Sequence, residues 1–458
     1  MTSRRLLLRG AEVGGELVDV SIGSDRIDEV AGVIVPAPAD EVVECGAGAL
    51  IPALYDHHLH LLSAAAAETS VNLAAPQVID RAGLERALLA AAASRSVGSW
   101  IRAVGYHESA AGDLDRQELD RIVPDSPVRV QHRSGALWML NSLGLASLGI
   151  QSDTGRLFGA DETIRQRLQP AEPPALAALS ARLAAYGVAG VTDATPSTEP
   201  SGIEMIGRAV TTGELRQRVA VMGASQLRAA DPIAGVEWGP VKIVLADHDL
   251  PDPATVGEEI SGAHRHGRPV AIHCVTAAAL AIALAAWNEA GALDGDRVEH
   301  GSLISTAAAD QLAQIGVTVV TQPGFVAQRG DDYLAEVDPH EVVDLYRCAS
   351  LISHGVGVGG SSDAPFGELD PWLAVEAAVR RRTPSGAVLG GEERLDARRA
   401  LDLFLTDLAR PGGRRRRVAP LQRADLCLLD APLAAVLADP GSHHVVATIA
   451  QGRVIFRR

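Results

Sequence analysis

The stretch GALIPALYDHHLHL, residues 48–61, begins as an apolar run and ends in three histidines. Such a run is typical of a strand that is buried on both faces. Alternate side chains of a strand point to the same side, so we expect His58 and His60 to project together and His57 to project away from them. Two imidazoles side by side form half of a metal site, although a His-x-His pair also occurs without any ligand role.

Seven more apolar runs follow, with helical stretches rich in Ala and Leu among them. The runs are GVAGVTDAT, QRVAVMGAS, GPVKIVLAD, PVAIHCV, DRVEHGS, VTVVTQP and VGVGGSSDA. This alternation predicts a parallel α/β fold, and eight strands are the number that a closed (β/α)8 TIM barrel requires. We expect the barrel to span residues 50–410, with an insertion at about 65–178 after its first strand.

Both ends of the chain carry short strand patterns of a different kind, such as LLLRGAEV near the start and ADLCLLDA near the end. We expect residues 1–49 and 411–458 to build one small β-sandwich together. Residues 433–443 are expected to form a loop between its strands.

The composition excludes several classes of protein. The net charge of −16 opposes binding to nucleic acid, and the one basic run, 414–417, is expected to be a solvated loop. The four cysteines are far apart in the sequence, so neither a disulfide framework nor a Cys-rich zinc site is expected. No stretch is apolar enough to cross a bilayer, which favours a cytoplasmic protein without a membrane partner.

Three more candidate ligands stand at the ends of predicted strands. His273 ends PVAIHCV, His300 ends DRVEHGS and Asp363 ends VGVGGSSDA, just before Pro365. Barrel enzymes place their catalytic groups at these carboxyl ends. Four imidazoles and a carboxylate at strand ends are hard to explain by packing, and they suit zinc as well as iron, nickel or manganese.

Lys242 is the only lysine in the chain, and it falls on the fourth predicted strand. Burial lowers the pKa of a lysine and makes its amine nucleophilic. A neutral amine takes up carbon dioxide to form a carbamate, an anionic ligand that is able to bridge two cations. The alternative is an ordinary surface lysine.

The order His58-x-His60, Lys242, His273, His300, Asp363 resembles that of the binuclear amidohydrolases. Longer stretches resemble the YtcJ-like branch, which includes N-substituted formamide deformylase; they include WIRAVGYHES, ELDRIVPDSPV, VEHGSL, TQPGF and GSSDAPFGELDPWLAVEAAV. The sequence departs from the branch where Cys274 follows the fifth-strand histidine and where Ala136 stands in the insertion. These departures affect the expected substrate pocket and leave the ligands intact.

The resemblance implies two divalent metal ions, with zinc preferred. His58, His60 and Asp363 would hold one ion, His273 and His300 the other, and a carbamate on Lys242 would bridge them. A metal-bound hydroxide would cleave a non-peptide C–N bond of a small-molecule amide, formamide or cyclic amide. Asp363 would carry the proton to the departing amine. Whether the chain forms a homodimer is left open by the sequence.

Three further side chains are candidates for binding substrate: Tyr106 and His132 at the ends of the two insertion strands, and Gln322 after the seventh barrel strand. Asp193 is expected to cap a loop. Two other functions remain open at this stage. A mononuclear deaminase of the same superfamily would lack the bridging lysine, and a non-catalytic scaffold would have lost ligands.

Overall fold

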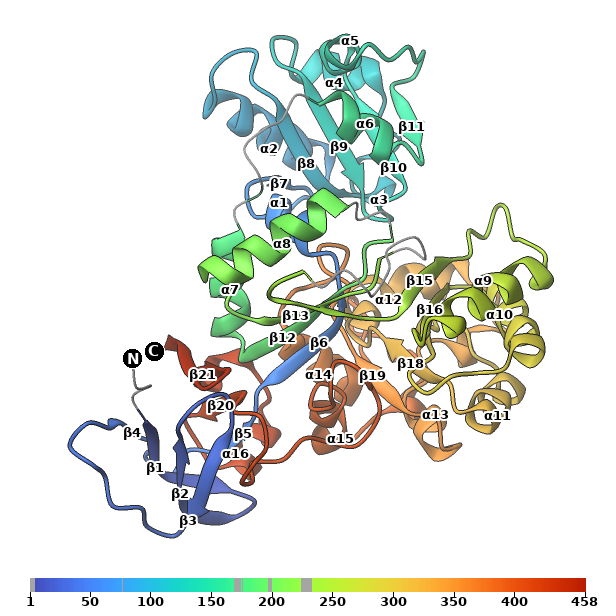
Figure 1. Ribbon diagram of the computed structural model, residues 1–458. Coiled ribbons are helices and arrows are strands. Elements are labelled where there is room, and N and C mark those ends of the chain that lie inside the picture. The colour runs from blue at the N-terminus through green and yellow to red at the C-terminus, as the bar shows by residue number, and fades with distance from the viewer. Residues whose placement is uncertain (1–4, 76, 169–173, 175, 197–199, 224–232) are drawn as a thin grey trace. The chain divides into compact units, whose positions relative to one another are not determined.

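The computed structural model describes residues 5–75, 77–168, 174, 176–196, 200–223 and 233–458 (Figure 1). The chain divides into two compact units. The first comprises Met1–Leu61 and Leu176–Arg458, and the second comprises Leu62–Ala175. The second unit therefore interrupts the first directly after the histidine-bearing strand.

Two four-stranded sheets in the first unit are built from the chain ends. One has the order β3 (Ile27–Ala31), β2 (Glu16–Ile22), β1 (Leu6–Val13), β4 (Glu41–Glu44). The other has the order β22 (Arg453–Arg457), β21 (Val445–Ala450), β20 (Leu426–Leu429), β5 (Leu50–Pro52). Side chains of both sheets, among them Leu8, Val20, Leu426 and Ile449, share one apolar cluster. Its burial holds the two ends of the chain together.

Two parallel sheets form the centre of the first unit. The first has the order β14 (Val236–Trp238), β13 (Arg218–Val221), β12 (Val188–Asp193), β6 (Leu54–Leu59). The second has the order β15 (Val241–Val244), β16 (Val270–Cys274), β17 (Arg297–His300), β18 (Thr318–Thr321), β19 (Val358–Gly360). Parallel strands that alternate with helices give the α/β fold that the sequence predicts.

Backbone hydrogen bonds join the edges of these two sheets. Asp363 donates from its amide to the carbonyl of His58 at 2.9 Å, so the end of β19 lies beside the end of β6. At the other edge Lys242 donates to the carbonyl of Gly223 at 3.0 Å, which joins β15 to the segment that follows β13. The histidine-bearing end of β6 and the segment after β19 are thereby held in register.

Helices follow the parallel strands, and α9, α10 and α11 lie on the outer side of β16–β18 (Figure 1). Several begin at side-chain caps that satisfy free backbone N–H groups: Asp252 caps α9, Thr276 caps α10 and Ser305 caps α11. The helices of the unit are α7 (Leu176–Ala185), α8 (Pro200–Thr212), α9 (Pro253–Arg265), α10 (Ala277–Ala290), α11 (Thr306–Ile315), α12 (Gly324–Glu336), α13 (Ala349–Ser353), α14 (Pro371–Arg380), α15 (Ala397–Asp402) and α16 (Leu433–Ala438).

The second unit has its own five-stranded sheet, in the order β11 (Arg156–Phe158), β10 (Leu137–Leu140), β9 (Val128–His132), β8 (Ile101–Tyr106), β7 (Val71–Asn72). Its helices are α2 (Arg81–Ala93), α3 (Glu108–Ala111), α4 (Arg116–Ile122), α5 (Ser142–Leu148) and α6 (Asp161–Arg167), and α1 (Leu61–Ala67) leads into it. A separate apolar cluster that includes Leu84, Leu119 and Val130 forms its core.

The structure corrects three local expectations. The run at 48–61 is two strands, because β5 leaves the parallel sheet and pairs with β20 instead. Residues 433–443 contain the helix α16 rather than only a loop. The run 414–417 is not wholly solvated, since the guanidinium of Arg416 lies 3.4 Å from the centre of the Tyr55 ring.

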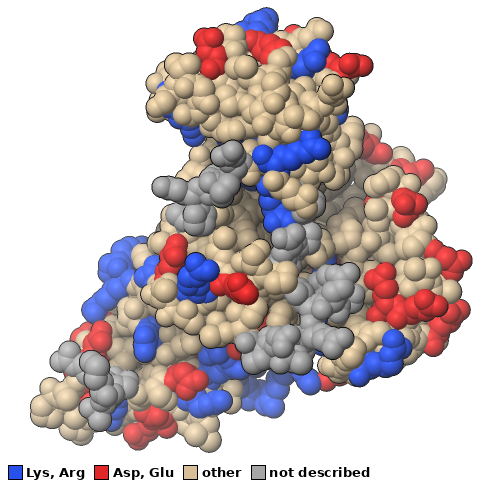
Figure 2. Space-filling view, turned by 45° about the horizontal axis from the view of Figure 1, so that its top comes forward, with Lys and Arg blue, Asp and Glu red and all other residues tan. Residues whose placement is uncertain are grey.

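The surface carries charged side chains of both signs (Figure 2), as expected for a chain with 41 Lys and Arg residues and 57 Asp and Glu residues. Acidic and basic side chains both appear on the face shown in Figure 2. Within the described part of the chain, no helix is both long enough and apolar enough to cross a membrane. The four cysteines are buried as free thiols.

Candidate functional site

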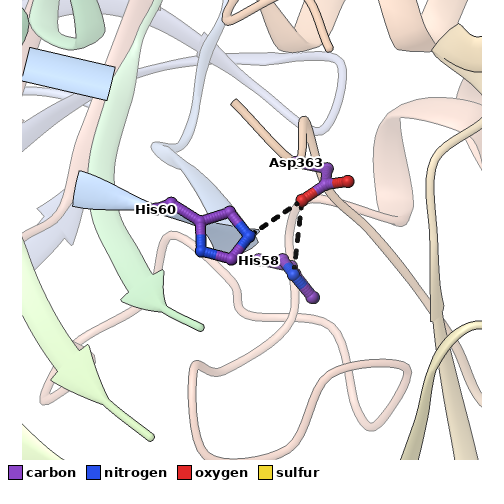
Figure 3. Close-up of side chains that lie close together, drawn as sticks. All are labelled: His58, His60 and Asp363. Atoms are coloured by element: carbon purple, nitrogen blue, oxygen red, sulfur yellow. Dashed lines mark ion pairs between the residues drawn. The ribbon is translucent and has the colours of Figure 1, made fainter. Parts of the chain in front are cut away.

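Three side chains converge where β6 and β19 end. Asp363 Oδ1 lies 3.4 Å from His58 Nε2 and 3.3 Å from His60 Nε2 (Figure 3). His58 belongs to β6, His60 follows directly after its end, and Asp363 stands three residues beyond β19. One ligand-type atom from each of the three lies within 4.8 Å of those of the other two. This spacing suits three ligands of one cation.

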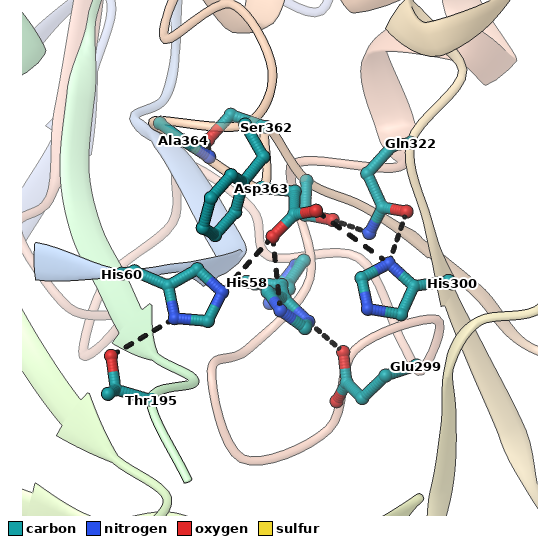
Figure 4. Close-up of polar contacts among 12 residues, drawn as sticks. His58, His60, Thr195, Glu299, His300, Gln322, Ser362, Asp363 and Ala364 are labelled. Atoms are coloured by element: carbon teal, nitrogen blue, oxygen red, sulfur yellow. Dashed lines mark hydrogen bonds and ion pairs between the residues drawn. The ribbon is translucent and has the colours of Figure 1, made fainter. Parts of the chain in front are cut away.

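Glu299 determines which ring nitrogen of His58 carries the proton. Its Oε2 lies at hydrogen-bond distance from His58 Nδ1, and both side chains are fully buried (Figure 4). Because the pKa of His58 is far below its usual value, chiefly through burial, the ring is neutral. Glu299 also accepts from Arg297 Nε at 2.5 Å through Oε1, so it forms a buried ion pair and Oε2 is left to accept from His58. The single ring proton of His58 is therefore on Nδ1, and Nε2 presents a lone pair to Asp363.

Thr195 fixes His60 in the same way. The Thr195 hydroxyl lies 3.1 Å from His60 Nδ1 and donates its own proton to Asp193 Oδ1 at 3.1 Å. It therefore accepts from Nδ1–H, and His60 Nε2 is the ring nitrogen that faces Asp363. Asp193 also accepts from the amide of Leu61 at 2.8 Å, so it holds the segment after β6 as a loop-capping carboxylate would.

Gln322 fixes His300. Gln322 Nε2 donates to Ser361 Oγ at 2.8 Å, which turns Gln322 Oε1 towards His300 Nδ1 at 2.9 Å. An amide oxygen only accepts, so His300 carries its proton on Nδ1 as well. The His300 ring lies 4.8 Å from that of His58 and 4.5 Å from that of His273, between ring centroids.

These three contacts, which we call clamps, each hold the Nδ1 side of one ring: that of His58, His60 or His300. Among the described residues, His58 Nε2, Asp363 Oδ1 and Lys242 Nζ are all buried without a hydrogen-bond partner. Buried polar atoms without partners are unfavourable and rare in folded proteins. Lone pairs of nitrogen and carboxylate oxygen that face one another fit a divalent cation, which accepts both.

Lys242 is 7% exposed on β15, and burial lowers the pKa of its amine. The positive form of Lys242 contributes to the lowered pKa of His58, His273 and His300, so the amine lies in the same electrostatic environment as these rings. Burial lowers the pKa of His273 to about 3. The environment favours neutral imidazoles and a neutral amine, the forms that bind metal or carbon dioxide.

The backbone is strained at two of the candidate ligands. His300 has φ 67° and Asp363 has φ 55°, both in the left-handed region that side chains other than glycine rarely adopt. Such conformations cost about 1–3 kcal/mol and persist where function needs a particular side-chain direction. Here the strain turns both side chains towards His58.

The structure adds residues that the sequence analysis missed. Glu299 and Arg297 lie two apart on the buried strand β17, so they share a face and form a buried ion pair. That spacing was a signal, because a charged pair inside a buried strand needs a partner. Asp56 was also missed. Its Oδ1 accepts from the amides of His58 and Ser362, and burial raises the pKa of Asp56 to about 7.

Two predicted substrate residues lie in the second unit. The Tyr106 hydroxyl donates to the carbonyl of Gly112 at 2.5 Å, and His132 Nε2 lies 2.9 Å from Glu108 Oε2. His57 packs as expected away from the cluster, fully buried, and its Nε2 lies 3.0 Å from the Thr406 hydroxyl. Gln322, the third predicted substrate residue, lies in the first unit and contacts His300 through its side-chain amide.

Comparison with known proteins gives one family match along nearly the whole chain. The model described as the amidohydrolase family matches residues 41–456. An N-substituted formamide deformylase of Arthrobacter pascens is 24% identical, over 86% of this chain and 85% of its own. The putative amidohydrolase YtcJ of Bacillus subtilis (strain 168) is 22% identical, over 92% of each chain. These matches confirm the resemblance to the YtcJ-like branch.

A solved structure has the same fold. It is an uncharacterized metal-dependent hydrolase from Pyrococcus horikoshii OT3, with a TM-score of 0.78 at 22% identity. The match covers 95% of this chain and 99% of that one.

Proposed function

The chain belongs to the amidohydrolase family, and from this premise we propose that it is a metal-dependent hydrolase of a non-peptide C–N bond in a small amide, formamide or cyclic amide. The observation that carries the proposal is that Nε2 of His58 and Nε2 of His60 both face an Asp363 oxygen that has no hydrogen-bond partner. Glu299 and Thr195 hold the opposite nitrogens of these two rings, and Gln322 holds His300 beside them. The formamide deformylase of Arthrobacter pascens supports the bond type by similarity.

We propose that the two parallel sheets close into one (β/α)8 barrel within residues 50–410. The hydrogen bonds from Asp363 to His58 and from Lys242 to Gly223 support this closure, since they join both pairs of sheet edges. The sheets of residues 1–49 and 411–458 would pack as a β-sandwich on their shared apolar cluster. The insertion at about 65–178 would follow the first barrel strand. Such a barrel gathers the carboxyl ends of all its strands at one mouth.

His58, His60 and Asp363 would hold one divalent cation, and His273 and His300 a second. Lys242 would bridge them after its neutral amine adds to carbon dioxide, forming an N–C bond and releasing one proton. When bound, divalent cations lower the pKa of water to near 7 and polarise a carbonyl as Lewis acids. Zinc is the first choice for such nitrogen and oxygen ligands, with manganese, iron and nickel as alternatives.

The residues of the chain then move the proton. The Asp363 carboxylate accepts a proton from the attacking water and delivers it to the amine nitrogen, so the C–N bond breaks with a neutral leaving group. Glu299 and Gln322 keep the rings of His58 and His300 oriented during this transfer. Tyr106 and His132 stay candidates for substrate contact.

The test is hydrolysis of N-formyl, N-acyl and cyclic amides by the full chain, loaded with zinc or manganese in the presence of bicarbonate. Turnover with two metal ions per chain is expected, together with a carbamate signal in ¹³C NMR after ¹³C-bicarbonate is added. Because Lys242 is the only lysine, Lys242→Met should abolish that signal. One tight metal ion and no carbamate would instead support a mononuclear deaminase, and no hydrolysis of any amide by metal-loaded protein would support a non-catalytic scaffold.

A further inference from the structure

An aromatic side chain lies directly against one of the candidate ligands. The Phe366 ring packs edge-on against the His60 ring, with 5.2 Å between centroids and 75° between planes. Phe366 is half-buried, so it is not enclosed in the core. It follows Asp363 by three residues, which brings an apolar surface next to the reactive cluster.

The position of Phe366 is well fixed. Its amide donates to the carbonyl of Asp363 at 2.8 Å, and its own carbonyl accepts from Arg329 Nη2. The Arg329 guanidinium lies 4.1 Å from the centre of the Phe325 ring, which anchors the arginine in turn. The phenyl group is therefore presented by a braced segment, and a rigid aromatic surface is suited to discriminating between ligands.

Of the three residues His58, His60 and Asp363, the one that Phe366 contacts is the most exposed. The side chain of His60 is 15% exposed, compared with 8% for Asp363 and 0% for His58. A compound that reaches a cation held by these three residues approaches past His60. The group beside its carbonyl then comes next to the Phe366 ring.

We propose that Phe366 determines the substrate class, selecting compounds with an apolar, preferably aromatic, group next to the scissile carbonyl. The inference rests on the proposed function, because it assumes that a carbonyl binds at the metal. An aromatic group gains both burial and ring contact against a phenyl surface, and a charged group there would lose water without gaining a partner.

The test uses two metal chelators, because their binding does not need turnover. Benzohydroxamate and acetohydroxamate share the chelating group and differ in a phenyl against a methyl. With zinc-loaded full chain, calorimetry should give benzohydroxamate the lower Kd by roughly 10- to 100-fold. In Phe366→Ala this preference should fall by at least about fivefold, and Phe366→Leu should keep part of it.

Phe456→Ala is the matched control, since Phe456 is also half-buried but lies on β22 in the C-terminal sheet. It should leave the preference unchanged. Metal content and circular dichroism are measured for every variant, and Phe366→Leu carries the test if Phe366→Ala does not fold.

The outcomes separate this inference from the function on which it rests. An equal preference in wild type and Phe366→Leu, with metal content intact, overturns the inference and leaves the hydrolase standing. Loss of metal from the Phe366 variants also overturns it, because Phe366 would then act only by supporting His60. If neither hydroxamate binds to wild type, the metal site and this inference both fail. If both bind as expected but no amide is hydrolysed, only the proposed reaction fails.

Discussion

Two buried polar clusters in the first unit contain similar residues but differ in how their atoms are paired. The base cluster comprises Tyr55, Arg218, Arg416 and Asp425. Both oxygens of Asp425 are occupied: Oδ2 accepts from the Tyr55 hydroxyl at 2.5 Å and from Arg218 Nε at 3.2 Å, and Oδ1 accepts from the amide of Gln451 at 2.6 Å. The buried atom of this cluster without a hydrogen-bond partner, Arg218 Nη2, is a donor, so the cluster presents no unpaired carboxylate oxygen to a cation.

The ligand cluster comprises His58, His60, His300 and Asp363, with Lys242 in the same electrostatic environment. Its outer atoms are paired with Glu299, Thr195 and Gln322. Its inner atoms His58 Nε2 and Asp363 Oδ1 lie 3.4 Å apart, and neither has a hydrogen-bond partner. Both clusters are buried and charged, so burial and charge do not distinguish them. What distinguishes a binding site is the direction of its unpaired lone pairs.

The largest effect is expected for Asp363→Asn. The amide removes the negative charge from the cation site and the group that carries the proton, so kcat/KM should fall by about 10³-fold or more. The metal-free variant should unfold at a urea concentration no lower than wild type, because the charge that it loses is unpaired there. Kinetics on metal-loaded protein and urea titration of metal-free protein measure the two effects. Retained activity, or a large loss of stability without metal, would make Asp363 an ordinary structural carboxylate.

The second-largest effect is expected in the base cluster, where a substitution should lower stability and leave activity unchanged. Asp425→Asn should lower the free energy of unfolding by about 2–3 kcal/mol, because it weakens a buried ion pair and a charged hydrogen bond. Activity per folded molecule should stay within about twofold of wild type. Urea unfolding of metal-free protein and kinetics below the transition measure both quantities. If activity is lost while stability is kept, the contrast between the clusters is wrong.

The sequence predicted that the candidate ligands lie at the ends of parallel strands, because strand alternation and the carboxyl ends of strands follow local rules. It failed where tertiary partners decide. Arg416 sits in a run of arginines that predicts a solvated loop, and only the fold brings Tyr55 beneath it. β5 was merged with β6 because β20, its actual partner, lies more than 370 residues away in the sequence. Glu299 carried a readable signal beside Arg297, but its contact with His58 spans 241 residues.

Glu299→Gln should weaken metal binding by roughly 10- to 100-fold, the range found when the partner of a ligating histidine is changed. Glutamine is neutral, so it holds the Nδ1 proton of His58 less strongly and leaves Arg297 without its anion. Competition with a chromogenic zinc chelator measures the affinity. Glu393→Gln is the control, since Glu393 is equally buried but pairs with Arg347 and Ser350. Equal affinities in the two variants would show that burial of a carboxylate, rather than its contact with His58, sets the metal affinity.

The smallest effect is expected for Gln322→Leu, and it tests whether a neutral clamp is needed at all. Leucine has a similar size but no oxygen, so His300 loses the acceptor of its Nδ1 proton and the ring can take the other tautomer. Because an amide clamps less strongly than a carboxylate, metal affinity should fall by about tenfold or less, and the ion at His300 should be lost first. Metal counting during chelator titration follows this order of release. Gln217→Leu is the control, because Gln217 is a buried amide that bonds Ser180 and the backbone elsewhere in the unit, and its loss should change stability without changing metal release. If Gln322→Leu releases both ions together, or if Gln217→Leu has the same effect, then Gln322 does not set the tautomer of His300. In that case the clamps differ from the contacts of the base cluster only in their position in the fold.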